Sequence, residues 1–183
     1  AVTWGGVVNM ETGESFTTEE GLGATDITGA WVDTVSGFVW LGSGGKGVVR
    51  FDFQQCESLQ PFNSNYGLLS DFATAVAGYV DEGLGISTVL VGTEEGLSAF
   101  ESLDGGEYTF KNTYTIDSGL SNNWVTDILI FDGVAYVATQ SGLTVFPLAE
   151  MDYPEQWKAY SAADGLPNSE IHCLEINDGI VYC

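Results

Sequence analysis

The apolar and polar positions of this chain repeat four times along its length. A Gly-Leu pair marks each copy, and the copies begin at Gly21, Gly67, Gly119 and Gly165, which are 46, 52 and 46 residues apart. After each pair a stretch of mostly alternating or continuous apolar residues begins, which predicts a strand. A period of this length is typical of solenoids, propellers and arrays. The pattern therefore indicates a repeat architecture.

Each copy contains four predicted strands separated by turn residues. In the copy between Gly67 and Gly119, an apolar strand from Ala73 leads to an Asp-containing turn and a bulky second strand. A third strand starts at the turn residue Gly96, and a more polar fourth strand follows near Tyr108. No long segment has the 3.6-residue period of a helix. The unit is therefore a four-stranded meander, which is the form of a propeller blade.

We predict an all-β protein, a β-propeller of four four-stranded antiparallel blades in one domain that spans residues 1–183. The predicted blades cover 23–66, 67–118, 119–164, and 165–183 together with 1–22. In the last blade, the C-terminal strands join the N-terminal strands in a velcro closure that removes open sheet edges. Two alternatives fit the same pattern. The chain is a piece of a ring of six to eight blades, or it is one module of a tandem or polymeric array.

The charge of the chain is strongly negative. Four Lys and Arg residues face 26 Asp and Glu residues, which gives a formal net charge of -22. Such a surface repels nucleic-acid backbones, and no stretch is apolar enough for membrane insertion. An acidic excess suits a salt-exposed or Ca²⁺-rich setting, where cations screen the self-repulsion. We therefore expect an extracellular, periplasmic or cell-surface location.

The repeat resembles a known propeller family. One matching segment is Gly165-Leu166-Pro167-Asn168-Ser169. In two others, Val91 to Phe100 and Val137 to Phe146, a small residue and Thr are followed two residues later by the pattern Gly-Leu-x-x-Phe. This pattern is similar to the two-component-regulator propeller repeat of periplasmic sensor regions and secreted propellers. The resemblance covers nearly the whole chain and implies the propeller fold. It implies little about function, because one fold serves many functions.

A ring of polar residues is the main candidate site. The loops that follow each Gly-Leu pair converge on one mouth of a propeller's axial channel, and they carry Asp26, Asp71, Asn122, Asn123, Asn168 and Ser169. Oxygen ligands around an axis could hold Ca²⁺, with Asp26 and Asp71 as its ligands, or a small polar ligand such as a saccharide. The alternative is that these side chains satisfy the backbone of their own turns.

Histidine and cysteine supply little chemistry. The single His172 has neither a triad partner nor a metal-binding cluster in the sequence, and three cysteines are too few for a disulfide scaffold. A disulfide between Cys173 and Cys183 would form if a three-residue loop joins the last two strands. A two-residue Asp-Gly turn would put these cysteines out of register.

These observations predict a non-enzymatic extracellular binding or structural module, with protein partners or self-association as a repeating subunit of a surface assembly or filament. No cofactor is expected apart from Ca²⁺. One alternative is a ligand-sensing fragment of a periplasmic sensor kinase. A second is a propeller lyase or hydrolase, although the related streptogramin-lyase-like propellers need a His-bearing metal site and this chain has one His.

Overall fold

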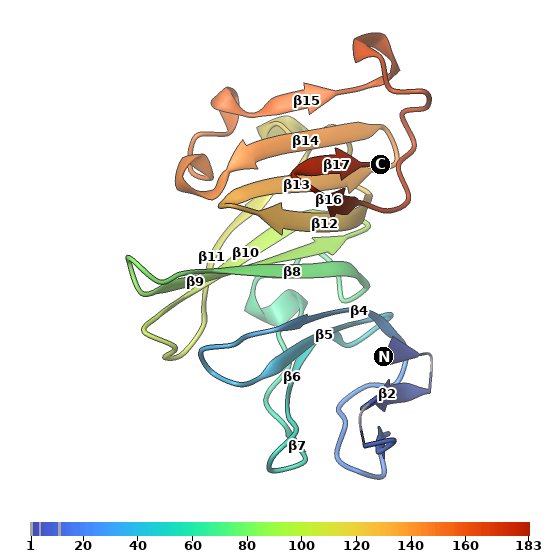
Figure 1. The fold of residues 1–183 in the computed structure, drawn as a ribbon, viewed down its shortest axis with the longest axis vertical. Helices are drawn as coiled ribbons and strands as arrows, with labels where there is room; N and C mark the ends of the chain where they lie inside the picture. Colours follow the sequence, from blue (N-terminus) through green and yellow to red (C-terminus); the bar gives the residue numbers. More distant parts are fainter. Residues whose placement is uncertain (1, 4, 11) are drawn as a thin grey trace.

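The computed structural model describes residues 2–3, 5–10 and 12–183, and it is built of antiparallel sheets placed one after another (Figure 1). The first blade contains β4 (Ile27–Val32), β5 (Val39–Ser43), β6 (Gly47–Asp52) and β7 (Glu57–Ser58). The second blade contains β8 (Ala73–Asp81), β9 (Ile86–Thr93), β10 (Gly96–Leu103) and β11 (Thr109–Tyr114). The third blade contains β12 (Val125–Phe131), β13 (Val134–Thr139), β14 (Gly142–Pro147) and β15 (Lys158–Tyr160).

Two smaller sheets flank these blades. The N-terminal sheet contains β1 (Val2–Thr3), β2 (Gly6–Val8) and β3 (Ser15–Phe16), and the C-terminal hairpin contains β16 (Glu175–Asn177) and β17 (Ile180–Tyr182). Helical structure in the described residues is confined to five short 3-10 turns, namely η1 (Ser64–Tyr66), η2 (Ile116–Ser118), η3 (Leu148–Glu150), η4 (Pro154–Gln156) and η5 (Ala162–Asp164). The predicted all-β, propeller-like architecture is confirmed.

The predicted velcro closure is not formed in the part of the chain that the structure describes. The C-terminal hairpin and the N-terminal sheet are separate sheets with no strand pairing between them. Each packs against the blade that is next to it in the sequence instead. Val7 and Phe16 lie in one apolar cluster with residues of the first blade, and Leu174 lies in another with residues of the third. The three blades between them keep the two partial sheets apart.

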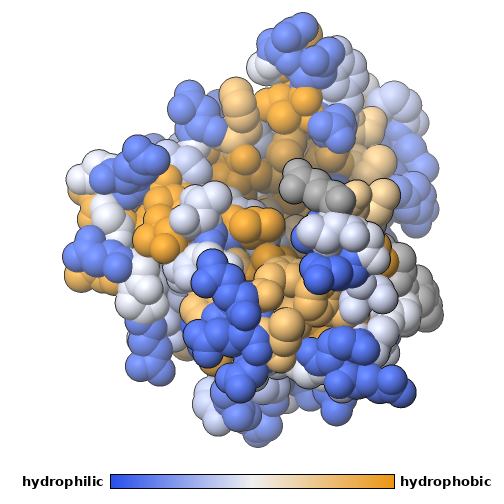
Figure 2. All heavy atoms as spheres, turned by 60° about the horizontal axis from the view of Figure 1, so that its bottom comes forward, coloured by the Kyte–Doolittle hydropathy of each residue, from blue (hydrophilic) through white to orange (hydrophobic). Residues whose placement is uncertain are grey.

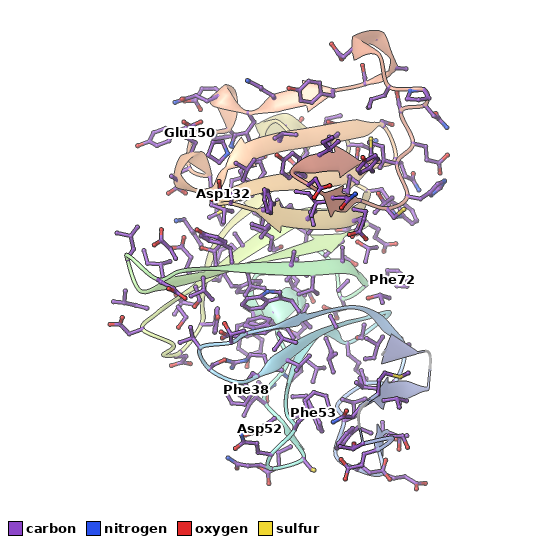
Figure 3. The ribbon with its side chains drawn as sticks, viewed as in Figure 1. Phe38, Asp52, Phe53, Phe72, Asp132 and Glu150 are labelled. Atoms are coloured by element: carbon purple, nitrogen blue, oxygen red, sulfur yellow. The ribbon has the colours of Figure 1, made fainter. Side chains whose placement is uncertain are left out.

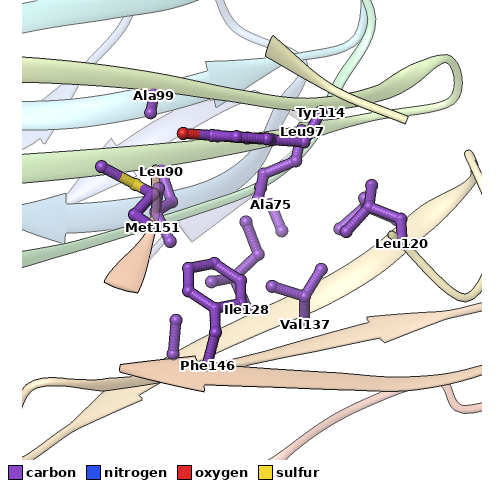
Figure 4. Packing of buried hydrophobic residues seen from close by; sticks show 12 residues of the cluster. Ala75, Leu90, Leu97, Ala99, Tyr114, Leu120, Ile128, Val137, Phe146 and Met151 are labelled. Atoms are coloured by element: carbon purple, nitrogen blue, oxygen red, sulfur yellow. The ribbon is translucent and has the colours of Figure 1, made fainter. Parts of the chain in front are cut away.

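The hydrophobic core lies between the sheets, not within any one of them. Four clusters of buried residues each combine side chains from two neighbouring sheets. In the largest cluster, Leu90 and Leu97 of the second blade meet Ile128, Val137 and Phe146 of the third (Figure 4). Alternation explains this, because successive side chains of a strand point to opposite faces and each face meets a different neighbour. Every blade is therefore held by its two neighbours.

A β-bulge opens the first strand of each complete blade. The register of β4, β8 and β12 against its partner shifts at Thr28, Thr74 and Thr126 respectively. The bulge directs two of these hydroxyls towards the next sheet along the chain. Thr28 Oγ1 donates to the Ala73 carbonyl at 2.6 Å, and Thr126 Oγ1 donates to the Ile171 carbonyl. The repeat therefore encodes joints between blades as well as the blades themselves.

The loops of the blades lie at two opposite ends of the sheets. Phe38 and Asp132, in the turns after the first strands of two blades, lie on one side, and Phe72, just before β8, lies on the other (Figure 3).

The face at the β7 end has hydrophobic residues in its interior and hydrophilic residues around much of its outline (Figure 2). None of the described helical segments has the length and apolar character needed to cross a membrane.

Candidate functional site

Three of the predicted mouth residues have a structural partner within their own loop. Asp71 Oδ1 accepts a hydrogen bond from Ser64 N at 2.7 Å, and Asn123 Oδ1 accepts one from Ile116 N at 2.7 Å. Ser169 Oγ accepts one from Ala162 N at 3.0 Å. The donors are the first residues of η1, η2 and η5, whose amide groups have no partner within the turn. The same position of the repeat therefore ties each turn to the strand that follows it.

The neighbouring amides bond locally in the same way. Asn122 Oδ1 accepts from Trp124 N at 2.8 Å, and Asn168 Oδ1 accepts from Glu170 N at 3.3 Å. Asp26 is half-buried, and its carbonyl accepts from Gly44 N at 3.0 Å. No group of three or more His, Cys, Asp or Glu side chains in the described residues could hold a metal ion. The geometry thus favours backbone satisfaction as the role of the side-chain oxygens of Asp71, Asn122, Asn123, Asn168 and Ser169, and not of the Asp26 carboxylate.

Replacing Asn123 with alanine tests this structural role. We expect a loss of about 1 kcal/mol in the free energy of unfolding, because Ile116 N would lose its acceptor. Asp26→Ala is the control, because no hydrogen bond to the Asp26 carboxylate is found in the described structure, and we expect it to change stability by less than about 0.5 kcal/mol. Urea unfolding followed by circular dichroism measures both. Equal losses for the two variants would contradict the structural role of Asn123.

Of the two arrangements considered for Cys173 and Cys183, the structure has the one without a disulfide, and all three cysteines are free and exposed. The reason is the hairpin register. Asn177 pairs with Ile180 across a two-residue turn, Asp178-Gly179, whose residues both have positive φ. Such a turn matches the twist of the strands. It places Tyr182 opposite Glu175, so Cys183 and Cys173 are one position out of register.

His172 lies at the surface, with a side chain 77% exposed and its Nε2 4.0 Å from Glu170 Oε1. It occupies the repeat position that carries Thr28, Thr74 and Thr126 in the complete blades. Glu170 lies beside it, but no group of three or more His, Cys, Asp or Glu side chains in the described residues could hold a metal ion. Its surroundings therefore supply no catalytic arrangement.

Arg50 belongs to a site that is absent from the residues predicted above. It lines a cavity of about 490 Å³ between the first and second blades, together with Gln60, Pro61, Phe62, Asn65, Tyr66, Gly67, Glu107, Tyr108, Thr109 and Phe110. Its volume is within the range of small-molecule sites. The guanidinium carbon lies 5.0 Å from the ring centroid of Phe62 and 5.5 Å from that of Trp40. Arg50 is thus a half-buried cation among aromatic rings.

The Arg50 charge has no direct counterion. No carboxylate of the described residues lies within 4.0 Å of its guanidinium nitrogens, and its buried Nε has no hydrogen-bond partner. Burial lowers the pKa of Arg50 from its usual value, although the negative charges of Glu107 and Asp33 and the Tyr108 hydroxyl oppose this shift. Partial removal of this cation from water costs free energy, which the surrounding rings and the remaining hydration of the half-buried side chain offset in part. An anionic group from a ligand would add an ion pair here.

The buried carboxylate of Asp33 fixes the position of Tyr108, one of the residues that line this cavity. Asp33 is fully buried and accepts hydrogen bonds from Val35 N at 3.0 Å, Ser36 N at 3.3 Å, the Ser36 hydroxyl, and Tyr108 Oη at 2.7 Å. Burial raises the pKa of Asp33, but these four donors outweigh it and leave the pKa below its usual value. Burial and the Asp33 bond raise the pKa of Tyr108 well above its usual value, so Tyr108 stays a donor. The pair fixes the second blade against the first.

The pH dependence of the stability of Asp33→Asn tests the contribution of the hydrogen bonds that the Asp33 carboxylate accepts. Because the folded-state pKa of Asp33 lies below its unfolded value of about 3.8, its stabilisation is present above about pH 4 and is lost as the pH falls through the folded-state value. We expect Asp33→Asn to lower the free energy of unfolding by about 1–2 kcal/mol at pH 7, with a difference from wild type that shrinks below pH 4. Urea titrations from pH 7 to pH 3 measure it. The exposed-site control Glu155→Gln should show no such change, and a constant difference for Asp33→Asn would contradict the assignment.

The repeat itself contains the signal for Arg50. In each blade this position faces the next blade and pairs across to the second strand, as Trp40–Arg50, Leu90–Ala99 and Tyr136–Val145. Arginine therefore stands where the other blades carry Ala99 and Val145. A basic residue at an apolar position of a repeat is a departure that alignment of the copies reveals. The cavity itself needs Phe62 and Tyr108, which only the fold brings beside Arg50.

Comparisons with known proteins agree on the fold alone. No protein-family model matches the chain, and no curated protein sequence is similar to it. A solved structure described as the extracellular domain of the putative hybrid two-component system BT3049 from B. thetaiotaomicron is similar, with a TM-score of 0.71 and 19% sequence identity. The match covers 92% of this chain and 22% of that chain. The chain thus has a propeller-like fold that resembles part of a larger bacterial domain.

Proposed function

We propose that this chain is a non-enzymatic, extracellular ligand-binding module built of propeller blades of the two-component-regulator type. The observation that carries the proposal is Arg50, a half-buried cation without an ion pair within 4.0 Å in the described residues, in a cavity of about 490 Å³. In a chain with a net charge of -22, this cation marks an unusual local environment. The similarity to an extracellular domain of a putative hybrid two-component system supports the propeller-like fold of this module.

The test is a ligand screen that reports where each compound binds. Amide resonances of ¹⁵N-labelled protein are recorded with libraries of small polar metabolites, including saccharides, organic acids and amino acids. We expect saturable shifts at Tyr66 and Phe110, which line the cavity and are partly exposed, and at the Arg50 side chain. Arg50→Met should weaken these shifts while its dispersed spectrum shows that the fold is kept. Binding confined to the Asp71 and Asn123 mouth would contradict the assignment to the cavity.

Self-association is a second candidate, and the free thiols favour it. Cys56, Cys173 and Cys183 are all exposed, so oxidation outside the cell could link chains into larger assemblies. Electrophoresis of the native protein, alkylated before lysis and run with and without reductant, tests this idea. A ladder that collapses on reduction and is lost in Cys56→Ser would support linkage through Cys56. Monomers under both conditions would count against it.

A further inference from the structure

The Arg50 cavity contains charges of both signs that do not meet. Arg50 comes from β6 of the first blade, and Glu107 comes from the connection between β10 and β11 of the second. Glu107 acts on Arg50 electrostatically, yet no salt bridge within 4.0 Å joins them. The two side chains line one cavity, and their charged groups are more than 4.0 Å apart. A ligand that carries an anion and a cation close together would complete both.

Aromatic surface lies beside these charges. Phe110 and Tyr66 are about half exposed, at 47% and 50%, and both line the cavity. The Phe110 ring lies directly against the backbone of Gly67, where an added Cβ would come within 2.2 Å of the ring. Gly67 also has a φ of 101°, which side chains rarely adopt. The Phe110 ring is therefore held against this loop and offers a fixed apolar surface for the apolar part of a ligand.

The overall charge of the protein restricts the ligand further. A net charge of -22 repels a free anion as it approaches, which works against a simple carboxylate. A zwitterion has no net charge and avoids this repulsion, while its two charged groups still satisfy Arg50 and Glu107. Exposed Glu107 stays hydrated when empty, so the energetic need lies mainly with Arg50. The combination favours a ligand that carries both a carboxylate and an ammonium group.

We propose that the cavity binds a free α-amino acid with an apolar or aromatic side chain. Its carboxylate pairs with the Arg50 guanidinium, its ammonium group pairs with the Glu107 carboxylate, and its side chain lies on Phe110 and Tyr66. This assignment rests on the proposed function of the cavity and names the chemical class of its ligand. In the described structure the buried Arg50 Nε has no hydrogen-bond partner, and the rings of Phe110 and Tyr66 are partly exposed to solvent. The ligand would contact these groups.

Isothermal titration calorimetry with three related compounds tests the assignment. L-phenylalanine carries both charges, 3-phenylpropanoate lacks the ammonium group, and 2-phenylethylamine lacks the carboxylate. We expect L-phenylalanine to bind wild type at least tenfold more tightly than either analogue, a difference of about 1.4 kcal/mol. Equal affinity for L-phenylalanine and 3-phenylpropanoate would overturn the role of Glu107 and with it the amino-acid assignment.

Variants separate the two charges. Glu107→Gln should weaken L-phenylalanine binding about tenfold and leave 3-phenylpropanoate as tight or tighter, because it removes the repulsion of that carboxylate. Arg50→Met should weaken both carboxylate compounds about tenfold or more. Glu155→Gln, an exposed change in η4 outside the cavity, should leave all three affinities unchanged. Thermal unfolding of each variant shows whether the fold is kept. If Arg50→Met does not fold, Glu107→Gln still tests the proposal, because Glu107 is exposed and its replacement should not disturb folding.

The outcomes distinguish this inference from the proposed function. If L-phenylalanine and related amino acids fail to bind at millimolar concentration while another class of compound shifts the cavity residues, the amino-acid assignment fails and the binding module stands. If no compound of any class binds the cavity, both fail. If Glu107→Gln and Glu155→Gln weaken binding equally, the effect is one of overall charge and the assignment fails.

Discussion

Trp40→Ala is expected to lower the free energy of unfolding by about 3–5 kcal/mol, the range seen when a large buried aromatic side chain is truncated. Trp40 is fully buried between the first and second blades. Its ring stacks on Phe62 with centroids 5.3 Å apart and meets the edge of Tyr108 at 4.7 Å. Alanine would leave a cavity that these rings could fill only in part. Urea unfolding followed by circular dichroism measures the change.

Trp40→Phe is the matched control. The indole Nε1 is buried without a hydrogen-bond partner, so removing that group relieves a cost while a ring remains against Phe62. We therefore expect a loss of only about 1 kcal/mol for Trp40→Phe. A loss below about 1 kcal/mol for Trp40→Ala would show that the two blades do not depend on this contact. The alanine variant should also weaken binding in the Arg50 cavity, because Trp40 flanks the guanidinium.

Gly92→Ala should destabilise the protein by about 1–3 kcal/mol through overpacking between the second and third blades. Gly92 lies in β9, and an added Cβ would stand 2.5 Å from Cγ1 and 2.9 Å from Cβ of Val125 in β12. The backbone of Gly92 has an ordinary φ, so the effect comes from contact and not from strain. Thermal and urea unfolding measure it.

Two comparisons make the Gly92 test specific. Gly45→Ala is the control, because Gly45 is exposed, lacks a positive φ, and has no atoms within 4 Å of an added Cβ. It should change stability by less than about 0.5 kcal/mol. Val125→Ala removes Cγ1, the closer of the two atoms that the Cβ added by Gly92→Ala would meet, and keeps Cβ at 2.9 Å. Because the clash is relieved in part, the double variant should lose less stability than the sum of the two single variants. Strict additivity would contradict a clash between these residues.

The sequence predicts the blades well because it repeats the features that form them. Alternating apolar residues produce two-sided strands, and Asp132-Gly133 and Asp178-Gly179 produce tight turns with positive φ at both residues. The closure of the ring is a different kind of prediction. Matching strand patterns at the two ends show that pairing is chemically compatible, but the pairing itself depends on how far each blade rotates against the next. That rotation is set by contacts such as Gly92 with Val125, which the pattern does not reveal.

The site was harder to predict than the fold for a physical reason. The oxygens of Asp71, Asn123 and Ser169 are suited both to binding a ligand and to accepting a bond from a turn amide. The sequence does not distinguish these roles, and in the structure the nearby amides take the oxygens. Arg50 and Tyr108 meet across two blades, so no local motif joins them. The departure of Arg50 from the repeat was visible, but the cavity was not.

The threonines at the three β-bulges give the joints between successive sheets unequal mechanical strength. Two of the three joints run forward along the chain, from a threonine hydroxyl on one blade to a carbonyl of the following repeat, Ala73 or Ile171. One such hydroxyl contributes far less than the ladder of bonds within a blade. The middle joint lacks this bond, because Thr74 Oγ1 is buried without a partner, and it depends on apolar contact together with the partly exposed Lys111–Asp152 ion pair at 3.4 Å. Under a pulling force the blades should therefore part from one another before any of them unravels, and the seam between the second and third blades has no threonine hydroxyl of this kind to resist shear.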